Sequence, residues 1–514
     1  MPVKASRLLR PAIGALTALA PAVMLLLLLR LGFGALPGDY TPWGSDQLDY
    51  WHETLSMREA GFAPGYYGYE EHPARLGRYG GHGFMFPLFY ATLSRLTGWD
   101  YATPVYFNTA LLVAAWAVFL CMTRPGLGRS LFCLALSLTF TPLFYWQGVL
   151  MQEPVQFAAA IVLAGWCALL LERKRENRLT TAFSLGFFTF LFLVGLLRFT
   201  WAFLCVPLFF CTRTDRAVIK PLLQAGVFIG LELVLYVAFV APYPYVTSVG
   251  TMLRQAIGGN AAPLLAHFRY NATEVFANQA FFYFNLVSYE IFFFLLVSGV
   301  ALLRSRKRDD ASQAARAFPW EALAPSFLIV FILAFFFVVH IVNGIIIGKH
   351  VAPFLLFGIL LLSGRIPLKY SWLFVVINLL LFPAFLADYR SAHYTSYVRS
   401  ALLRQYIGEF KAKIAPYVRY EPKASPWCNT MVMTNFPGVI SGLPAGVAFN
   451  NVYASDKLQG PLKSQYVLVA SQGQRDQFAR FNDLEFLTAT QYGDLYRNKS
   501  SLCFAAPAKP GNGE

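Results

Sequence analysis

Ionisable side chains occur at four separate places where long apolar stretches of the sequence begin or end. Six side chains are involved. Three are acids, namely Asp46, Asp49 and Glu153, and three are bases, namely Arg198, Lys349 and His350. An ionisable group at membrane depth is costly, so such residues are functional candidates by default. Carboxylates can accept a proton from a reacting group, and guanidinium and ammonium groups bind anionic oxygens. We therefore expect one polar site, assembled at a membrane face.

The three acids also have simpler explanations. Asp46 and Asp49 lie one helical turn apart just after the first apolar stretch, where water could solvate them. Glu153 directly precedes Pro154, so it could stabilise the N-terminus of a helix. Neither explanation accounts for the cations that the same sequence places at other membrane boundaries.

The bases have simpler explanations as well. Arg198 and Lys349 could extend to lipid head groups. A histidine alone is weaker evidence, which applies to His350 and more strongly to His82, in a glycine-flanked loop. The joint pattern favours a site, because two separated acids and two separated cations are predicted to converge on one face of the membrane.

The composition indicates which elements hold these residues. Of the 514 residues, 57% are hydrophobic and only 13% are charged, whereas charged residues make up about 25% of soluble globular proteins. We expect an α-helical polytopic membrane protein. The net charge of +15 could indicate a nucleic-acid partner, but the basic residues fall mostly in short loops. Membrane lipids are therefore the expected surroundings, and no nucleic acid is expected.

The apolar stretches predict about eleven membrane-spanning helices of roughly 17–25 residues each. The first runs from Pro11 to Leu36 after Lys4, Arg7 and Arg10, and is predicted to be an uncleaved anchor rather than a signal peptide. The others are expected to begin near Pro104, Ser130, Pro154, Thr181, Trp201, Pro221, Phe281, Leu323, Val351 and Ser371.

Basic residues alternate along these connections. They cluster at Arg124/Arg129, 172–178, 213–220, 304–308 and 365–369. By the positive-inside rule these loops and the N-terminus are cytoplasmic. We expect an inner (plasma) membrane protein whose first loop and C-terminus face the periplasm or exterior. Loss of a weak span near 195–201 would break this alternation.

Two segments outside the spans are long. The first loop, residues 37–101, carries eight acidic residues against four basic ones and many aromatics, which is unlike a disordered linker. It is counted within a membrane domain of residues 1–387. Residues 388–514 are polar and are expected to form a small outer α/β domain.

Periodicity in the outer domain predicts a helix over Thr395–Tyr417. It also predicts strands at Asn429–Thr434, Gln465–Ala470 and Glu485–Ala489. Cys428 and Cys503 are the two cysteines of this domain. They could form one disulfide in an oxidising compartment or remain unpaired.

Several motifs resemble those of GT-C glycosyltransferases, the polytopic class that includes protein O-mannosyltransferases and lipid A aminoarabinose transferases. The stretch DQLDYWHETLSMREAG is similar to the first-loop signature, with Asp46, Tyr50 and Gly61 at its Asp, Tyr and Gly positions. FPLFYATLSRLTG is similar to a Pro-containing run into a small amphipathic helix, with Pro87, Tyr90 and Gly98 matching.

Two later motifs extend the resemblance over residues 11–387. In GLLRFTW, Arg198 lies where many relatives have Arg followed by Pro. In GKHVAPFLLFGILLL, three residues match a basic–aromatic–Pro segment: Lys349, His350 and Pro353. The chain departs from the pattern in three respects, since Gln47 replaces the second acid, Lys349–His350 replaces Arg-Tyr, and Pro87 is single rather than doubled.

The resemblance implies inverting transfer of a sugar from a polyprenyl-phosphate donor to a hydroxyl of a glycan, lipid or protein on the outer face. Asp46 is the expected general base, supported by Asp49. Glu153 is expected to orient the acceptor or share the proton. Lys349 and Arg198, with His350 in support, would hold the donor phosphate. Two further residues, Tyr50 and His82, are predicted to position substrate.

Three alternatives remain open at this stage. Two or three carboxylates could hold a divalent cation, but Lys and Arg can neutralise a monophosphate, so no metal cofactor is expected. A transporter or lipid flippase would more often show an internal repeat and charges near the bilayer midplane. A polysaccharide polymerase or ligase that uses a pyrophosphate-linked glycan usually has its large loop late in the chain, whereas here that loop is first.

The topology can be tested by cysteine labelling. Gly68→Cys in the first loop should react with a membrane-impermeant reagent added from outside, and Gln313→Cys, beside a basic cluster, should not. Reporter fusions at the same two positions provide a second measurement. Equal labelling of both cysteines from outside would contradict the predicted orientation.

Overall fold

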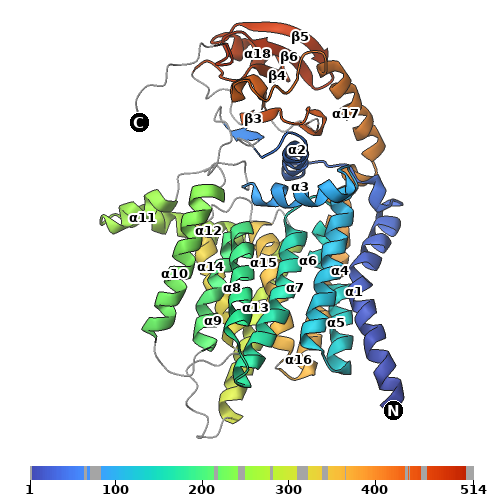
Figure 1. Ribbon diagram of the computed structural model, residues 1–514, viewed down its shortest axis with the longest axis vertical. Helices are drawn as coiled ribbons and strands as arrows, with labels where there is room; N and C mark the ends of the chain where they lie inside the picture. The colour runs from blue at the N-terminus through green and yellow to red at the C-terminus, as the bar shows by residue number, and fades with distance from the viewer. Residues whose placement is uncertain are drawn as a thin grey trace.

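A computed structural model of the chain shows a bundle of helices with a smaller sheet-containing domain at one end (Figure 1). The structure describes residues 3–62, 66–69, 83–212, 218–240, 249–277, 282–308, 322–338, 345–364, 366–434, 438, 440–452 and 460–504. The predicted fold class, an α-helical polytopic protein with a small C-terminal α/β domain, is confirmed.

The first half of the helical part contains α1 (Val3–Phe33), α4 (Thr103–Thr123), α5 (Leu127–Thr139), α6 (Thr141–Gln147), α7 (Glu153–Arg175), α8 (Thr181–Leu197), η2 (Phe199–Leu204) and α9 (Cys205–Cys211). The second half contains α10 (Ile219–Leu235), the π-helical turn η3 (Tyr236–Val240), α11 (Val249–Ile257), α12 (Ala262–Ala277), α13 (Phe282–Arg308), α14 (Leu323–Val338), α15 (Ile345–Ser363) and α16 (Leu368–Tyr397).

Among the described residues, six helices are long and apolar enough to cross a membrane: α1, α4, α7, α10, α13 and α16. The pair α5–α6, bent by 48°, makes up to seven. Shorter apolar helices occur in α8, η2 with α9, α14 and α15. The chain is therefore a multi-pass membrane protein, and the count of about eleven spans stays a prediction.

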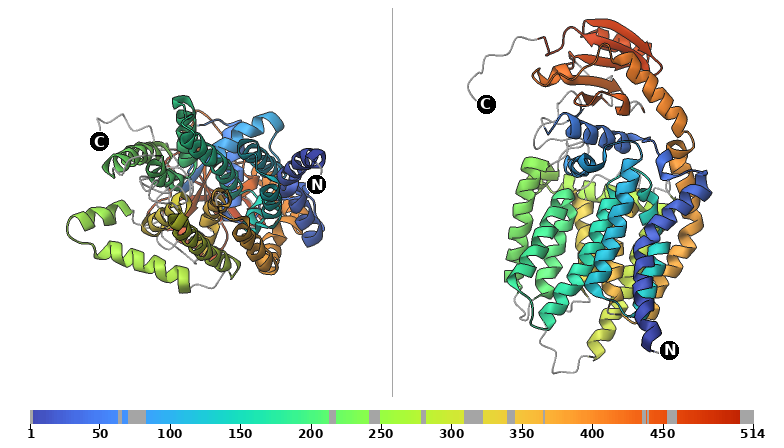
Figure 2. Two further views of the ribbon diagram at one scale, coloured as in Figure 1. Left: turned by 90° about the horizontal axis from the view of Figure 1, so that it is seen from below. Right: turned by 45° about the vertical axis from the view of Figure 1, so that its right-hand side comes forward.

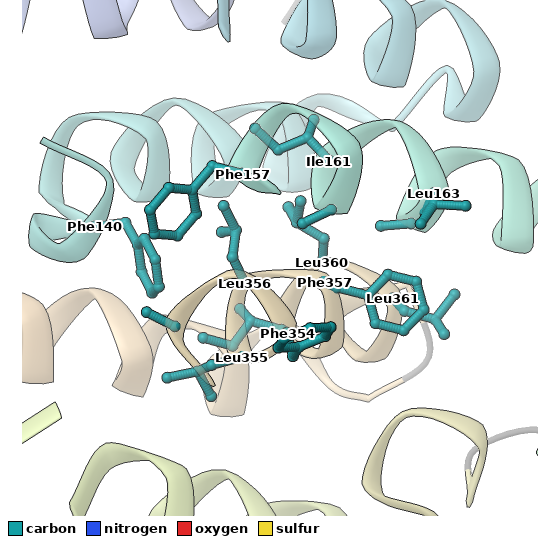
Figure 3. Packing of buried hydrophobic residues seen from close by; sticks show 14 of the residues in the cluster. Phe140, Phe157, Ile161, Leu163, Phe354, Leu355, Leu356, Phe357, Leu360 and Leu361 are labelled. Atoms are coloured by element: carbon teal, nitrogen blue, oxygen red, sulfur yellow. The ribbon is translucent and has the colours of Figure 1, made fainter. Parts of the chain in front are cut away.

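Helix α7 is the central helix of the bundle. The structure buries 78% of its most apolar window, against 39% or less in the other five long helices. Figure 3 shows Phe157 of α7 facing Leu356 of α15 across this contact. The packing fixes the first turn of α7, where Glu153 lies, relative to the start of α15.

The first loop folds into η1 (Pro37–Asp39), α2 (Ser45–Glu59), β1 (Tyr67–Tyr69) and α3 (Met85–Thr97). Helices α2 and α3 pack against each other. Both lie between the bundle and the sheet domain (Figures 1 and 2). The loop is thus ordered over these elements, as its aromatic content predicts.

The sheet domain follows α17 (Ser400–Ile414). It contains η5 (Pro426–Asn429), β2 (Thr430–Thr434), η6 (Ile440–Gly442), β3 (Ala448–Val452), β4 (Tyr466–Val469), α18 (Gln472–Ala479), β5 (Leu484–Thr490) and β6 (Gly493–Asn498). The strand order is β1-β3-β2-β4-β6-β5. Strands β1, β3, β2 and β4 are parallel, and β6 is antiparallel to both β4 and β5.

The three predicted strands are present as β2, β4 and β5. The predicted helix over Thr395–Tyr417 is divided, because α16 continues to Tyr397 and α17 begins at Ser400. Helix α16 therefore runs past residue 387, and the domain boundary placed there stays a prediction. Of the two alternatives for Cys428 and Cys503, the structure has the disulfide.

The first loop supplies part of the sheet domain. Strand β1 pairs in parallel with β3 at the edge of the sheet. Leu48 of α2 lies in the same hydrophobic cluster as Phe410 and Met431. His52 bonds to the carbonyl of Val447 (2.7 Å). Helix α2 thus lies between the bundle and the outer domain and contacts both.

Candidate active site

The N-terminal end of α2 presents Asp46 and Tyr50 toward the bundle. Asp46 lies in the first turn, after Gly44, whose φ of 105° favours glycine. Tyr50 is one turn further along the helix. Its ring packs edge-on against Phe86 of α3, 4.7 Å between centroids, and its hydroxyl accepts a hydrogen bond from the side-chain amide of Gln152. The direction of the Tyr50 side chain is therefore fixed.

Glu153 lies in the first turn of the central helix α7. Its side chain is 3% exposed, and Oε1 contacts Lys349 and His350, while Oε2 has no hydrogen-bond partner among the described residues. The N-cap residue of α7 is Gln152, which makes no side-chain cap bond. The helix N-terminus favours a negative charge here, but the geometry shows that Glu153 also takes part in a charge cluster.

Lys349 connects the two acids. Its Nζ lies 3.7 Å from Oδ2 of Asp46 and 3.6 Å from Oε1 of Glu153. The preceding residue, Gly348, allows this approach, because a β-carbon there would lie 2.5 Å from the carbonyl oxygen of Phe284 on α13. A larger residue at position 348 would push the start of α15, and with it Lys349, away from α13.

An aromatic ring supports the same ammonium group. Lys349 Nζ lies 4.8 Å from the ring centroid of Trp146, a distance suited to a cation–π contact. Trp146 in turn stacks on Phe284. Three elements, α6, α13 and α15, thus hold Lys349 between the carboxylates.

Arg198 and His350 form the second half of the cluster. Arg198 follows the last residue of α8 in extended conformation and donates a hydrogen bond to His350 Nδ1. A guanidinium only donates, so Nδ1 is the acceptor and the imidazole is neutral, with its proton on Nε2. His350 Nδ1 also lies 3.9 Å from Oε1 of Glu153. This second contact would become an ion pair only on protonation of the ring.

Five predicted side chains therefore meet at one place, although they are far apart in sequence. They are Asp46, Glu153, Arg198, Lys349 and His350, with Tyr50 beside them. With His350 neutral, two cations face two carboxylates. Lys349 contacts carboxylates and Arg198 contacts the imidazole, which argues against the explanation that both simply extend to lipid head groups.

Two predicted residues are not placed in this cluster. Asp49 is buried on α2, close to Asp46 and Glu53, and its Oδ1 has no hydrogen-bond partner among the described residues. Burial, reinforced by the charges of Asp46 and Glu53, raises the pKa of Asp49 well above its usual range. Its catalytic role stays a prediction. His82 lies outside the described residues.

Sequence reasoning did not identify Gln152 and Trp146 as parts of the site. Both occur in FYWQGVLMQEP, the stretch that ends at Glu153. An aromatic and polar connection between two apolar helices was the available signal. Gln47, which replaces an acid of the resembled motif, accepts a hydrogen bond from the Tyr40 hydroxyl (2.7 Å) instead of entering the cluster.

Within the described part of the chain, no group of three or more His, Cys, Asp or Glu side chains is arranged to hold a metal ion. The cluster contains only two carboxylates that share a cation, Lys349. The expectation of a metal-independent site stays a prediction.

Comparisons with known proteins give one structural similarity. No protein-family model matches the chain, and no curated protein matches it in sequence. The structure is similar to a solved structure described as the crystal structure of ArnT from Cupriavidus metallidurans bound to undecaprenyl phosphate. The two share 12% identity with a TM-score of 0.47, over 96% of this chain and 99% of that chain.

The buried acid on α2 makes stability depend on pH. Burial raises the pKa of Glu53 to about 8 from an ordinary value of 4.5, so folded protein holds a proton that unfolded protein releases. Its stabilising contribution is complete below pH 4.5 and is lost as the pH rises to 8. Glu53→Gln should therefore gain stability over wild type across this range, by about 1.4 kcal/mol per pH unit. Thermal unfolding at pH 5, 6.5 and 8 measures the difference.

Glu59→Gln is the matched control for that experiment. Glu59 lies on the same helix, and its side chain is 49% exposed. The control should show the same pH dependence as wild type. A constant difference between Glu53→Gln and wild type at all three pH values would contradict the buried, protonated acid.

Proposed function

We propose that this protein is an integral membrane glycosyltransferase, which transfers a sugar from a polyprenyl-phosphate donor to a hydroxyl acceptor on the outer face of the membrane. One observation carries the proposal. Lys349 lies between Asp46 and Glu153, and Arg198 with His350 completes the same cluster. Inverting glycosyl transfer from a phosphate needs these two kinds of group side by side, a proton acceptor and cations for the leaving group.

In the proposed reaction the acceptor oxygen attacks the anomeric carbon as the bond from that carbon to the phosphate oxygen breaks. The acceptor proton passes to a carboxylate, and the phosphate leaves with the electron pair of the broken bond. The charge that develops on the acceptor oxygen and the charge that develops on the leaving phosphate both appear outside bulk water, where preorganised groups are most effective. No covalent intermediate with the protein is needed.

Asp46 is the better placed of the two carboxylates to act as the base. Its side chain is 27% exposed, whereas that of Glu153 is 3% exposed. An acceptor arriving from solvent can therefore reach Asp46 more readily. Glu153 contacts Lys349 and His350, so its proposed role is to hold these groups in place and to help orient the acceptor.

Lys349 and Arg198 are the proposed phosphate ligands. In the structure Lys349 balances two carboxylates, and Arg198 donates only to a neutral imidazole, with its buried Nη1 making no hydrogen bond among the described residues. The guanidinium therefore has donor capacity left for phosphate oxygens. Tyr50, fixed by Gln152, is a proposed positioning residue for the sugar or acceptor.

The proposed setting is the inner membrane, with a cytoplasmic N-terminus and a C-terminal domain in the periplasm or outside the cell. The donor would enter from the bilayer and the acceptor from the outer side. The mechanism needs no metal, because two cationic side chains can neutralise a departing monophosphate.

Replacement of the base should affect chemistry more than binding. Asn has nearly the shape of Asp but cannot accept the proton, so Asp46→Asn should lower transfer by about 10²- to 10⁴-fold with donor affinity largely kept. Asp49→Asn should be milder, because that buried acid is proposed to be neutral already. Transfer of radiolabelled sugar to an extracted acceptor fraction measures both variants at matched protein levels.

Two results would argue against that assignment. Full activity in Asp46→Asn together with loss of activity in Asp49→Asn would identify Asp49, one helical turn later, as the base. Absence of sugar transfer from every donor tested with wild type would favour a transporter instead.

Loss of the bridging cation should weaken donor binding and turnover together. Lys349→Ala removes a proposed phosphate ligand and also leaves Glu153 buried without the cation that contacts it, so some loss of stability is expected. Lys349→Arg keeps the charge but offers a planar fork in place of a point charge, so partial activity is expected. Donor affinity and rate should be measured per folded protein. Wild-type affinity and rate in Lys349→Ala would contradict the leaving-group role.

A further inference from the structure

An exposed tryptophan directly precedes the helix that carries the proposed base. Trp43 is three residues before Asp46, at the entry to α2, and 40% of its surface is exposed. Most of the large aromatic side chains that the structure describes in the first loop are more deeply buried, for example Tyr50 at 2% and Trp51 at 7%. A large, partly apolar ring left open at the start of the helix that carries the proposed base is suited to contact with a substrate.

The position of Trp43 is not that of a membrane anchor. Interfacial tryptophans place their rings at the level of the lipid head groups. The ring of Trp43 instead contacts Gly438, a buried residue of the outer domain between β2 and η6. This domain lies on the far side of α2 from the bundle (Figures 1 and 2). Trp43 therefore faces away from the bilayer, toward the side from which an acceptor would come.

Neighbouring groups hold Trp43 in place. A β-carbon on Gly438 would lie 2.5 Å from Cζ3 of the indole, so only glycine leaves room for the ring as it stands. The backbone N–H of Trp43 donates to Oε1 of Gln47, which also accepts from the Tyr40 hydroxyl. That hydroxyl accepts in turn from the backbone N–H of Leu150. A ring fixed in this way loses little conformational entropy on binding.

We propose that Trp43 is a platform for a sugar ring of the acceptor, and hence that the acceptor hydroxyl belongs to a carbohydrate. This rests on the proposed function and narrows its acceptor class. The face of an indole carries negative partial charge, and the C–H groups on one face of a pyranose are weakly positive and apolar. The ring would stack on the indole on the outer-domain side of α2, and the rest of the acceptor would extend past the N-terminus of this helix, so that a hydroxyl further along the same carbohydrate reaches Asp46.

The test compares three acceptor fractions from the host envelope: delipidated polysaccharide, protein, and extractable lipid without sugar. Each is supplied with a panel of radiolabelled polyprenyl-phosphate sugars. We expect transfer to polysaccharide. Trp43→Ala should raise the KM for this acceptor by about tenfold, within the range of one aromatic contact, and Trp43→Phe should restore most of the affinity.

Two further variants separate a contact with substrate from a general loss of structure. Gly438→Ala pushes a methyl group into the indole from the opposite domain and should also raise the acceptor KM. Phe486→Ala removes an aromatic side chain that is 54% exposed on β5, and should leave the KM unchanged. Hydrolysis of the donor without acceptor should be the same in all these proteins.

The outcomes distinguish the inference from the function on which it rests. If wild type neither hydrolyses nor transfers from any donor, the proposed glycosyltransferase function is wrong. If it transfers to protein or to sugar-free lipid, or if Trp43→Ala keeps the wild-type KM for polysaccharide, the function stands and the carbohydrate platform is wrong.

Discussion

The site depends on the ion pairs that Lys349 makes with Asp46 and Glu153. A carboxylate as buried as Glu153 is costly to ionise unless a cation lies close to it. Lys349 supplies that cation, and its own position depends on the close approach of Gly348 to α13 and on the face of Trp146. The packing of α7 against α15 therefore has an electrostatic consequence, because it sets the distance between Glu153 and Lys349, on which the proposed chemistry depends.

Helix α2 connects this cluster to the outer domain. Its Asp46 and Tyr50 face the cluster, while Leu48 and His52, each two positions away along the helix, are buried against the outer domain. Burial lowers the pKa of His52 to about 4, so the ring is neutral near pH 7 and its Nε2–H donates to the Val447 carbonyl. A shift of the outer domain would move the helix that carries Asp46. The outer domain is thus a structural support of the candidate site.

Much of the arrangement could be predicted from the sequence, because the signals were local. The length of the apolar stretches predicts membrane spans, and runs of β-branched and aromatic residues predict β2, β4 and β5. The cost of placing a charge near a bilayer identifies Glu153 and Lys349 as functional candidates. What the sequence could not show depends on distant pairing. Strand β1 becomes a strand only beside β3, some 380 residues later. Strand β3, AFNNV, carries two asparagines, which are rare in strands, and is held by β2 and β1 on either side.

The difference between local signals and distant pairing also explains why the sequence alone could not assign different roles to the acids of α2. Asp46, Asp49 and Glu53 follow one another at helical spacing and are chemically alike. Their environments differ, since Asp46 meets Lys349, whereas Asp49 and Glu53 are buried near each other and burial raises the pKa of both. Neighbouring carboxyl groups are assigned to different roles by the environments that set their protonation. Here the cation of α15 makes that difference, because it reaches the first turn of α2 and contacts Asp46 alone of the three.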